Sequence, residues 1–111
     1  MEAFVVRDGL DSCPVGCGGE VILVRCLPGR RLAGWCWACE VSLPIPLPAD
    51  YPLSDDDMDP ARYAPGGLEL PARAEVAAAG LSGQVVGAVP AAEWLGRLAW
   101  ADKTRRTRRC T

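Results

Sequence analysis

The chain has 111 residues, of which half are hydrophobic and 23% are charged, and this composition excludes a disordered protein. Its 12 glycines and 10 prolines, against only 6% aromatic residues, predict many turns. A chain this short gains limited stability from its core and often depends on a covalent or metal staple. The six cysteines can supply one, whereas the absence of histidine excludes Ser-His-Asp, Cys-His and His-ligated metal chemistry.

Charge is distributed unevenly along the chain. Residues 1–39 carry equal numbers of acidic and basic side chains, whereas residues 40–96 carry nine acidic and two basic ones. Residues 97–111 carry six basic side chains and one acidic one. This distribution favours either pairing within the chain or two partner surfaces of opposite sign.

The beginning of the chain, residues 1–8, contains neither a basic region nor a long apolar run. We therefore expect no secretory signal, no membrane partner and a cytoplasmic location. In a reducing cytoplasm the cysteines are expected to be metal ligands or free thiols rather than disulfides. If the chain were exported by another route, 15 disulfide pairings would be open to it.

Four cysteines form two closely spaced pairs. Three residues separate Cys13 from Cys17, two separate Cys36 from Cys39, and eighteen lie between the pairs. Zn²⁺ prefers four tetrahedral ligands, and a closely spaced cysteine pair brings two sulfurs to one side of the ion.

The segment between the pairs is typical of a β-hairpin. Residues 20–25 are rich in β-branched side chains, residues 28–31 have turn chemistry, and residues 32–35 form the returning strand. Such a hairpin carries one cysteine pair at its start and the other at its end, so the two pairs are expected to meet.

This arrangement resembles the zinc ribbon, a small metal-stapled β-hairpin module, over residues 11–47. The resemblance rests on the Cys13-Pro14 start, the Cys17-Gly18 step and the Gly-Trp-x-Cys-x-x-Cys sequence at 34–39. The chain departs from the common pattern in the spacing of the first pair and at Glu40, where glycine often follows the last cysteine. The resemblance implies a structural zinc ion held by four thiolates, those of Cys13, Cys17, Cys36 and Cys39.

Other interpretations of the cysteines stay open. Four thiolates also suit iron, and the sequence does not separate the two metals. Cys36-Trp37-Ala38-Cys39 alone can be a redox dithiol, although the extended sequence after it offers no helix N-terminus to lower a thiol pKa. Cys26 is expected to be a buried free thiol, with a place in the ligand set as the alternative. Cys110 is expected to be a thiol without a structural role.

The middle of the chain has two distinctive stretches. Residues 43–48 alternate apolar side chains with prolines, which predicts an extended segment that packs Leu43, Ile45 and Leu47 on the hairpin. Residues 55–59 resemble the start of a calcium loop, but Pro60 stands where such a loop requires glycine. We therefore expect a solvated acidic loop in which Asp59, before Pro60, begins a helix.

Two helices are predicted near the C-terminus. The first covers residues 71–79 and the second begins at Pro90 and runs from 91 to about 103. In the second helix Ala91, Trp94, Leu95, Leu98 and Ala99 share one face, and Trp100 lies on the other. Residues 75–89 either form a helix-turn-helix or contain a strand over 84–89, and glycines in the second half favour the strand.

The predicted fold is therefore a small α+β protein. A metal-stapled zinc-ribbon β-hairpin is followed by a Pro-rich extended segment and by one or two short C-terminal helices. The expected units are a zinc-ribbon-like module (1–48), an acidic Pro/Gly-rich linker (49–70), a helical extension (71–104) and a basic tail (105–111).

These observations favour a small non-enzymatic interaction module, because no catalytic base, nucleophile pair or cofactor loop is evident. We expect a protein partner within a larger, nucleic-acid-associated assembly, with Trp37 and Trp100 as partner anchors, and no small-molecule substrate. Alternatively, the chain binds nucleic acid directly through the phosphates. The side chains that would do so are Arg30, Arg31, Lys103, Arg105, Arg106, Arg108 and Arg109.

Overall fold

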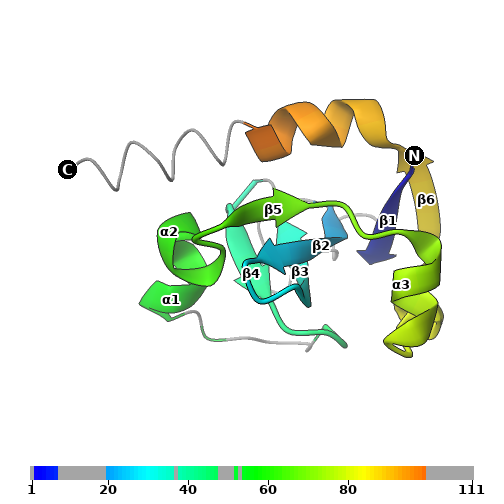
Figure 1. The fold of residues 1–111 in the computed structure, drawn as a ribbon, viewed down its shortest axis with the longest axis horizontal. Helices are drawn as coiled ribbons and strands as arrows, with labels where there is room; N and C mark the ends of the chain where they lie inside the picture. Colours follow the sequence, from blue (N-terminus) through cyan, green and yellow to red (C-terminus); the bar gives the residue numbers. More distant parts are fainter. Residues whose placement is uncertain (1, 8–19, 37, 48–51, 53, 100–111) are drawn as a thin grey trace.

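The computed structural model describes residues 2–7, 20–36, 38–47, 52 and 54–99. In this part of the chain six antiparallel strands form one sheet, accompanied by short helices (Figure 1). The strand order is β4-β3-β2-β1-β6, and β5 pairs with β2 outside this path. The strands are β1 (Glu2–Arg7), β2 (Val21–Leu27), β3 (Arg31–Cys36), β4 (Val41–Leu43), β5 (Gly67–Glu69) and β6 (Gly87–Pro90).

β2 is the central strand of the sheet. One edge of β2 pairs with β3 from Val21↔Cys36 to Cys26↔Arg31. The other edge is shared, because β1 pairs with the beginning of β2 and β5 pairs with its end. The sequence of β2 is almost continuously apolar, as expected for a strand that is buried on both faces.

Each face of the sheet carries its own hydrophobic core. The Trp35 core combines sheet residues with residues from distant helices: Ala3, Val5, Ile22, Val24, Cys26, Ala33, Trp35, Tyr63, Ala64, Leu70, Ala91, Trp94 and Leu98. The Cys36 core lies on the other face and contains Phe4, Val6, Val21, Leu23, Cys36, Val41, Leu43 and Val76. Alternate residues of β2 enter the two cores, so this strand holds both of them together.

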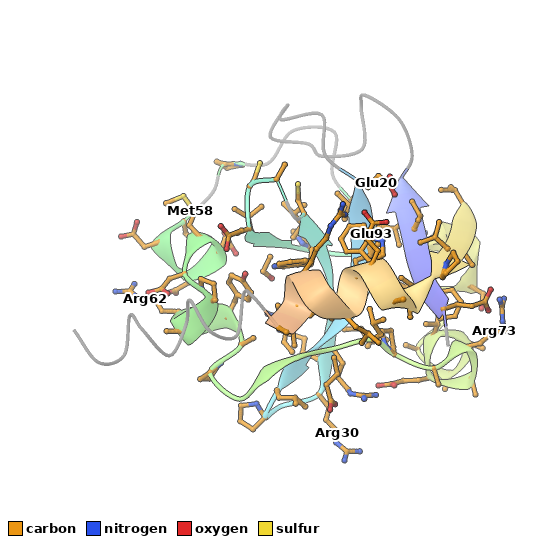
Figure 2. The ribbon with its side chains drawn as sticks, turned by 90° about the horizontal axis from the view of Figure 1, so that it is seen from above. Glu20, Arg30, Met58, Arg62, Arg73 and Glu93 are labelled. Atoms are coloured by element: carbon orange, nitrogen blue, oxygen red, sulfur yellow. The ribbon has the colours of Figure 1, made fainter. Side chains whose placement is uncertain are left out.

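The helices cover the sheet from both sides. They are α1 (Asp55–Met58), α2 (Pro60–Tyr63), α3 (Arg73–Ala78), a 3-10 turn (Ser82–Gln84) and a helix over residues 91–99. The last of these lies across the strands and buries Ala91, Trp94 and Leu98 in the Trp35 core (Figure 2). α3 contributes Val76 to the Cys36 core.

The predicted α+β class and the hairpin are confirmed, since β2, the turn at 28–30 and β3 follow the expected order. The predicted helix over 71–79 is α3, and the second predicted helix is observed over 91–99, beyond which residues lie outside the described part. Residues 75–89 do not form a helix-turn-helix. After α3 the chain makes the 3-10 turn and enters β6, which pairs with β1.

The main described part of the stretch that we expected to be a linker, residues 54–70, packs with the sheet. It contains α1, α2 and β5, and it buries Tyr63, Ala64 and Leu70 in the Trp35 core. Its average composition is acidic and rich in turn residues, but a few apolar residues at the right positions suffice to attach it to the sheet. β6, from the predicted helical extension, likewise pairs with β1 of the predicted module, so these two described parts share one sheet.

Candidate metal centre and charged surfaces

The second cysteine pair lies in the tight turn between β3 and β4. Cys36 ends β3, where it pairs with Val21 of β2 and with Val41 of β4. The backbone N–H of Glu40 donates a hydrogen bond of 2.7 Å to the carbonyl oxygen of Cys36 and so closes the turn. Cys36 is fully buried and Cys39 packs against the same Cys36 core, so both cysteines lie on one side of the sheet.

Glu40, the residue after the last cysteine, adopts a left-handed backbone conformation with φ 55°. A non-glycine residue held in this region costs on the order of 1 kcal/mol. The turn therefore needs at Glu40 the conformation that glycine adopts most easily. Here a glutamate adopts it, held by the turn bond to Cys36 and by a tertiary hydrogen bond from Tyr63.

The first cysteine pair belongs to a segment whose two ends lie beside Cys36. Arg7, the last residue of β1, pairs with Val21, and Val21 pairs with Cys36 on its other edge. Cys13 follows Arg7 by six residues and Cys17 precedes Val21 by four. Extended chains of these lengths span at most about 20 Å and 13 Å, so the chain length permits both cysteines to approach Cys36.

Cys13 and Cys17 themselves lie outside the described residues. Among the residues that the structure does describe, no three potential metal ligands are grouped. The two described members of the predicted ligand set, Cys36 and Cys39, share one turn.

A buried tyrosine links this turn to α2. The indole N–H of Trp35 donates a hydrogen bond of 2.9 Å to the Tyr63 hydroxyl oxygen. The Tyr63 hydroxyl in turn donates to the carbonyl oxygen of Glu40 at 3.1 Å. Trp35 is 0% exposed and Tyr63 is 8% exposed, so water does not compete freely for these groups. Sequence reasoning missed Tyr63, since nothing local relates it to the cysteines.

Trp35 is also braced by the helix over residues 91–99. The ring of Trp94 meets the ring of Trp35 edge to face, with centroids 6.3 Å apart and an interplanar angle of 72°. This geometry is favourable for aromatic pairs. The Arg97 guanidinium stacks on the outer side of Trp94, 4.6 Å from the ring centroid.

Cys26 is a buried free thiol, as predicted. Burial raises the pKa of the Cys26 thiol above its ordinary value. It lies five residues beyond Val21 along β2, about 16 Å at the usual strand rise, and its side chain enters the Trp35 core. Cys26 is therefore remote from Cys36 and on the opposite face, which removes it from the ligand set.

Most described arginines are paired with acidic side chains. Arg25 contacts both Glu69 and Glu75, and the pKa of Arg25 is raised above its ordinary value, chiefly by the hydrogen bond to Glu69. Three other arginines also form ion pairs: Arg62 with Asp56, Arg73 with Glu2, and Arg97 with Glu93.

Arg30 and Arg31 differ from these arginines. Both are exposed at the turn between β2 and β3, and neither forms an ion pair with any residue that the structure describes. Figure 2 shows Arg30 at the end of the hairpin opposite Glu20, the neighbour of Val21. The unpaired cations and the cysteine turn thus lie at opposite ends of β2. The predicted basic residues Lys103, Arg105, Arg106, Arg108 and Arg109 lie outside the described residues.

A pocket of about 450 Å³ opens between β5, the end of β2 and the helix over residues 91–99. Its wall is largely leucine, contributed by Leu27, Leu68, Leu95 and Leu98. Leu95 is 47% exposed, and the Arg25–Glu69 ion pair forms one side. An apolar surface of this kind suits contact with another side chain. The predicted anchors Trp37 and Trp100 lie outside the described residues.

No described helix is long and apolar enough to cross a membrane. Comparisons with protein families, with curated proteins and with solved structures found no match to this chain.

Proposed function

We propose that this protein is a small non-enzymatic interaction module whose hairpin is stapled by a structural zinc ion. It acts as an accessory or structural subunit of a larger assembly. The observation that carries the proposal is the turn from Cys36 to Glu40, because both ends of the segment bearing Cys13 and Cys17 are fixed beside it.

The chemistry of the donor set fits zinc. Cys36 and Cys39 share one turn and one face, and the chain length allows Cys13 and Cys17 to reach them. When bound, the ion would supply folding free energy by joining the start of β2 to the end of β3. Four thiolates fill the tetrahedral shell and leave no position for a substrate, which supports an interaction role over catalysis.

The metal content of the purified, reduced full chain tests this proposal. We expect about one equivalent of zinc per chain, and we expect Cys36→Ser to lose it on dialysis against a chelator. Cys26→Ser is the matched control, because it makes the same substitution at a buried strand position on the opposite face. This control should keep its zinc although its core is weakened.

Removal of the metal is expected to unfold more than the hairpin. β2 belongs to both cores, so losing the staple should abolish the circular dichroism of strands and helices in one transition. Less than a tenth of an equivalent of any transition metal in the wild-type protein, or equal metal loss in the two variants, would refute the proposal. One equivalent of iron would support the same site with the other metal.

A second candidate function is direct binding of nucleic-acid phosphates. The two unpaired cations at the hairpin turn, Arg30 and Arg31, favour it, because other arginines of the described region are neutralised by neighbouring carboxylates. The basic residues after the last described helix would extend the same kind of contact.

A further inference from the structure

We infer that Tyr63 is a positioning residue for the metal site, an inference that rests on the proposed zinc function. Its hydroxyl group holds the turn from Cys36 to Glu40 in the conformation that presents Cys39 to the ion. The printed sequence gives no link between Tyr63 and the cysteines; in the structure Tyr63 bonds to the backbone of Glu40 and to the indole of Trp35.

The hydrogen bonds at Glu40 fix the residue that directly follows Cys39. The Glu40 N–H donates to the carbonyl oxygen of Cys36, and the Glu40 carbonyl oxygen accepts from Tyr63. These bonds hold the peptide units on either side of Glu40, at a residue whose left-handed φ of 55° is unfavourable for glutamate. Without the bond from Tyr63, the backbone that follows Cys39 is held less firmly, and the Cys39 side chain loses its fixed orientation.

The other hydrogen bond places Tyr63 against the residue before Cys36. Trp35 is fully buried, and its indole N–H reaches the same hydroxyl group that reaches Glu40. One oxygen atom thus joins the residues that flank the Cys36–Cys39 pair on either side. Groups outside the ligand shell commonly orient metal ligands in this way.

The hydroxyl is delivered by a segment distant in sequence from the turn. Tyr63 ends α2, which begins at the Asp59 cap and at the buried Pro60. The next residue, Ala64, is buried in the Trp35 core, so the position of Tyr63 is set on both sides. α2 therefore acts as a clamp on the cysteine turn.

The test compares Tyr63→Phe with Tyr51→Phe, which removes a hydroxyl group from the other tyrosine of the chain. Zinc-loaded full-length proteins are mixed with excess EDTA, and the rate of zinc loss is followed with a chromogenic zinc indicator. We expect Tyr63→Phe to lose zinc about 10-fold faster than wild type, the lower end of the roughly 10- to 100-fold by which removing an outer-shell partner weakens metal affinity. Tyr51→Phe makes the same chemical change and leaves the bond from Tyr63 to Glu40 in place, so an equal acceleration in both variants would count against the inference.

A stability control separates positioning from general weakening. Leu98→Ala truncates a buried apolar side chain of the Trp35 core, which takes no part in the hydrogen bonds that hold the cysteine turn. We expect Leu98→Ala to lower the melting temperature more than Tyr63→Phe and to accelerate zinc loss less. The inference would be overturned if the rate of zinc loss rose in the same order as the melting temperature fell across the three variants.

The Co²⁺-substituted proteins give a second, spectroscopic measurement. The ligand-field absorption of Co²⁺ reports the geometry of its ligands, which a purely global loss of stability leaves unchanged. We expect a shifted ligand-field band in Tyr63→Phe and wild-type bands in Leu98→Ala. A wild-type spectrum together with wild-type zinc loss in Tyr63→Phe would overturn the role of Tyr63 and leave the zinc proposal standing. A wild-type chain without metal would instead refute the zinc proposal itself.

Glu40→Gly tests the same idea through the backbone. Glycine adopts the left-handed conformation readily, so the turn should depend less on the bond from Tyr63. In this background the 10-fold effect of Tyr63→Phe is expected to shrink to a few-fold. An equal factor in both backgrounds would show that Tyr63 does not act through Glu40 and would overturn the inference.

Discussion

Asp59 determines where α2 begins and hence where Tyr63 is placed. Its backbone is extended, its side chain accepts a hydrogen bond of 3.0 Å from the N–H of Ala61, and Pro60 occupies the first helical position. Proline is tolerated there because the N–H of that position has no helical partner. This N-cap and this proline were both evident from the sequence, and the structure confirms them.

Asp59→Ala is expected to lower the free energy of unfolding by about 1 kcal/mol, because it removes the cap of α2. Asp59→Asn keeps an oxygen that can accept from Ala61 and is expected to stay close to wild type. The ion pair with Arg62, 3.8 Å long and largely exposed, should contribute little. Urea unfolding of the zinc-loaded proteins measures both values. If Asp59→Asn were as damaging as Asp59→Ala, the charge and not the cap would be the stabilising feature.

Among the elements, the helix over residues 91–99 contributes three residues to the Trp35 core, as many as β2 does. It buries Ala91, Trp94 and Leu98, which recur at helical spacing, but it leaves Leu95 nearly half exposed beside the leucine-lined pocket. The predicted apolar face was therefore broader than the stripe that contacts the sheet. A flat sheet surface receives one row of helix side chains, and the flanking positions stay accessible.

Leu98→Ala and Leu95→Ala make the same change on the same helix and differ in burial. Leu98 is 4% exposed, so its truncation is expected to cost about 2 to 5 kcal/mol of unfolding free energy. Leu95 is 47% exposed, and its truncation is expected to cost less than about 1 kcal/mol. Urea denaturation followed by circular dichroism compares them. Similar costs would indicate that Leu95 is covered in solution, for example by a partner copy.

At the scale of the whole molecule, ion-paired arginines and arginines without a described partner lie in different places. Acidic side chains of α1, β5 and α3 neutralise arginines near them, while Arg30 and Arg31, at the turn of the central hairpin, form no ion pair with any described residue. The turn that carries Arg30 and Arg31 lies at the opposite end of β2 from the cysteine turn. A phosphate-binding role would therefore use the opposite end of the hairpin from the metal.

Replacing Arg30 and Arg31 together with Ala tests the nucleic-acid function. If these side chains contact phosphates, the slope of log affinity against log salt should flatten by about 2 units, at about 0.9 per lost contact on duplex DNA. Arg62 and Arg73 replaced together are the control, since both are already paired and should change the slope little. Labelled duplex and single strands, titrated at two salt concentrations, provide the measurement. Binding weaker than about 10⁻⁴ M at low salt would exclude this function.

The candidate metal site could be predicted only in part. The spacing of the four cysteines and the hairpin between them were visible locally, and the structure places Cys36 and Cys39 at the end of that hairpin, as expected. Only the register of β2 showed that Cys26 is not a ligand. Its distance from Cys36 along the strand, and the face of the sheet that its side chain enters, both depend on how the strands pair. Zinc itself stays a prediction.

The sequence by itself determined the hairpin of β2 and β3, the start of α2 at Asp59 and Pro60, and the helical segments near the C-terminus. Each of these follows from neighbours within a few residues, where turn chemistry, capping and periodicity act directly. Only the tertiary structure decided that β1 and β5 share one edge of β2, that an acidic stretch joins the core, and that Tyr63 reaches Glu40. These features depend on contacts between residues far apart in the chain, whose energy comes from packing that no local pattern encodes.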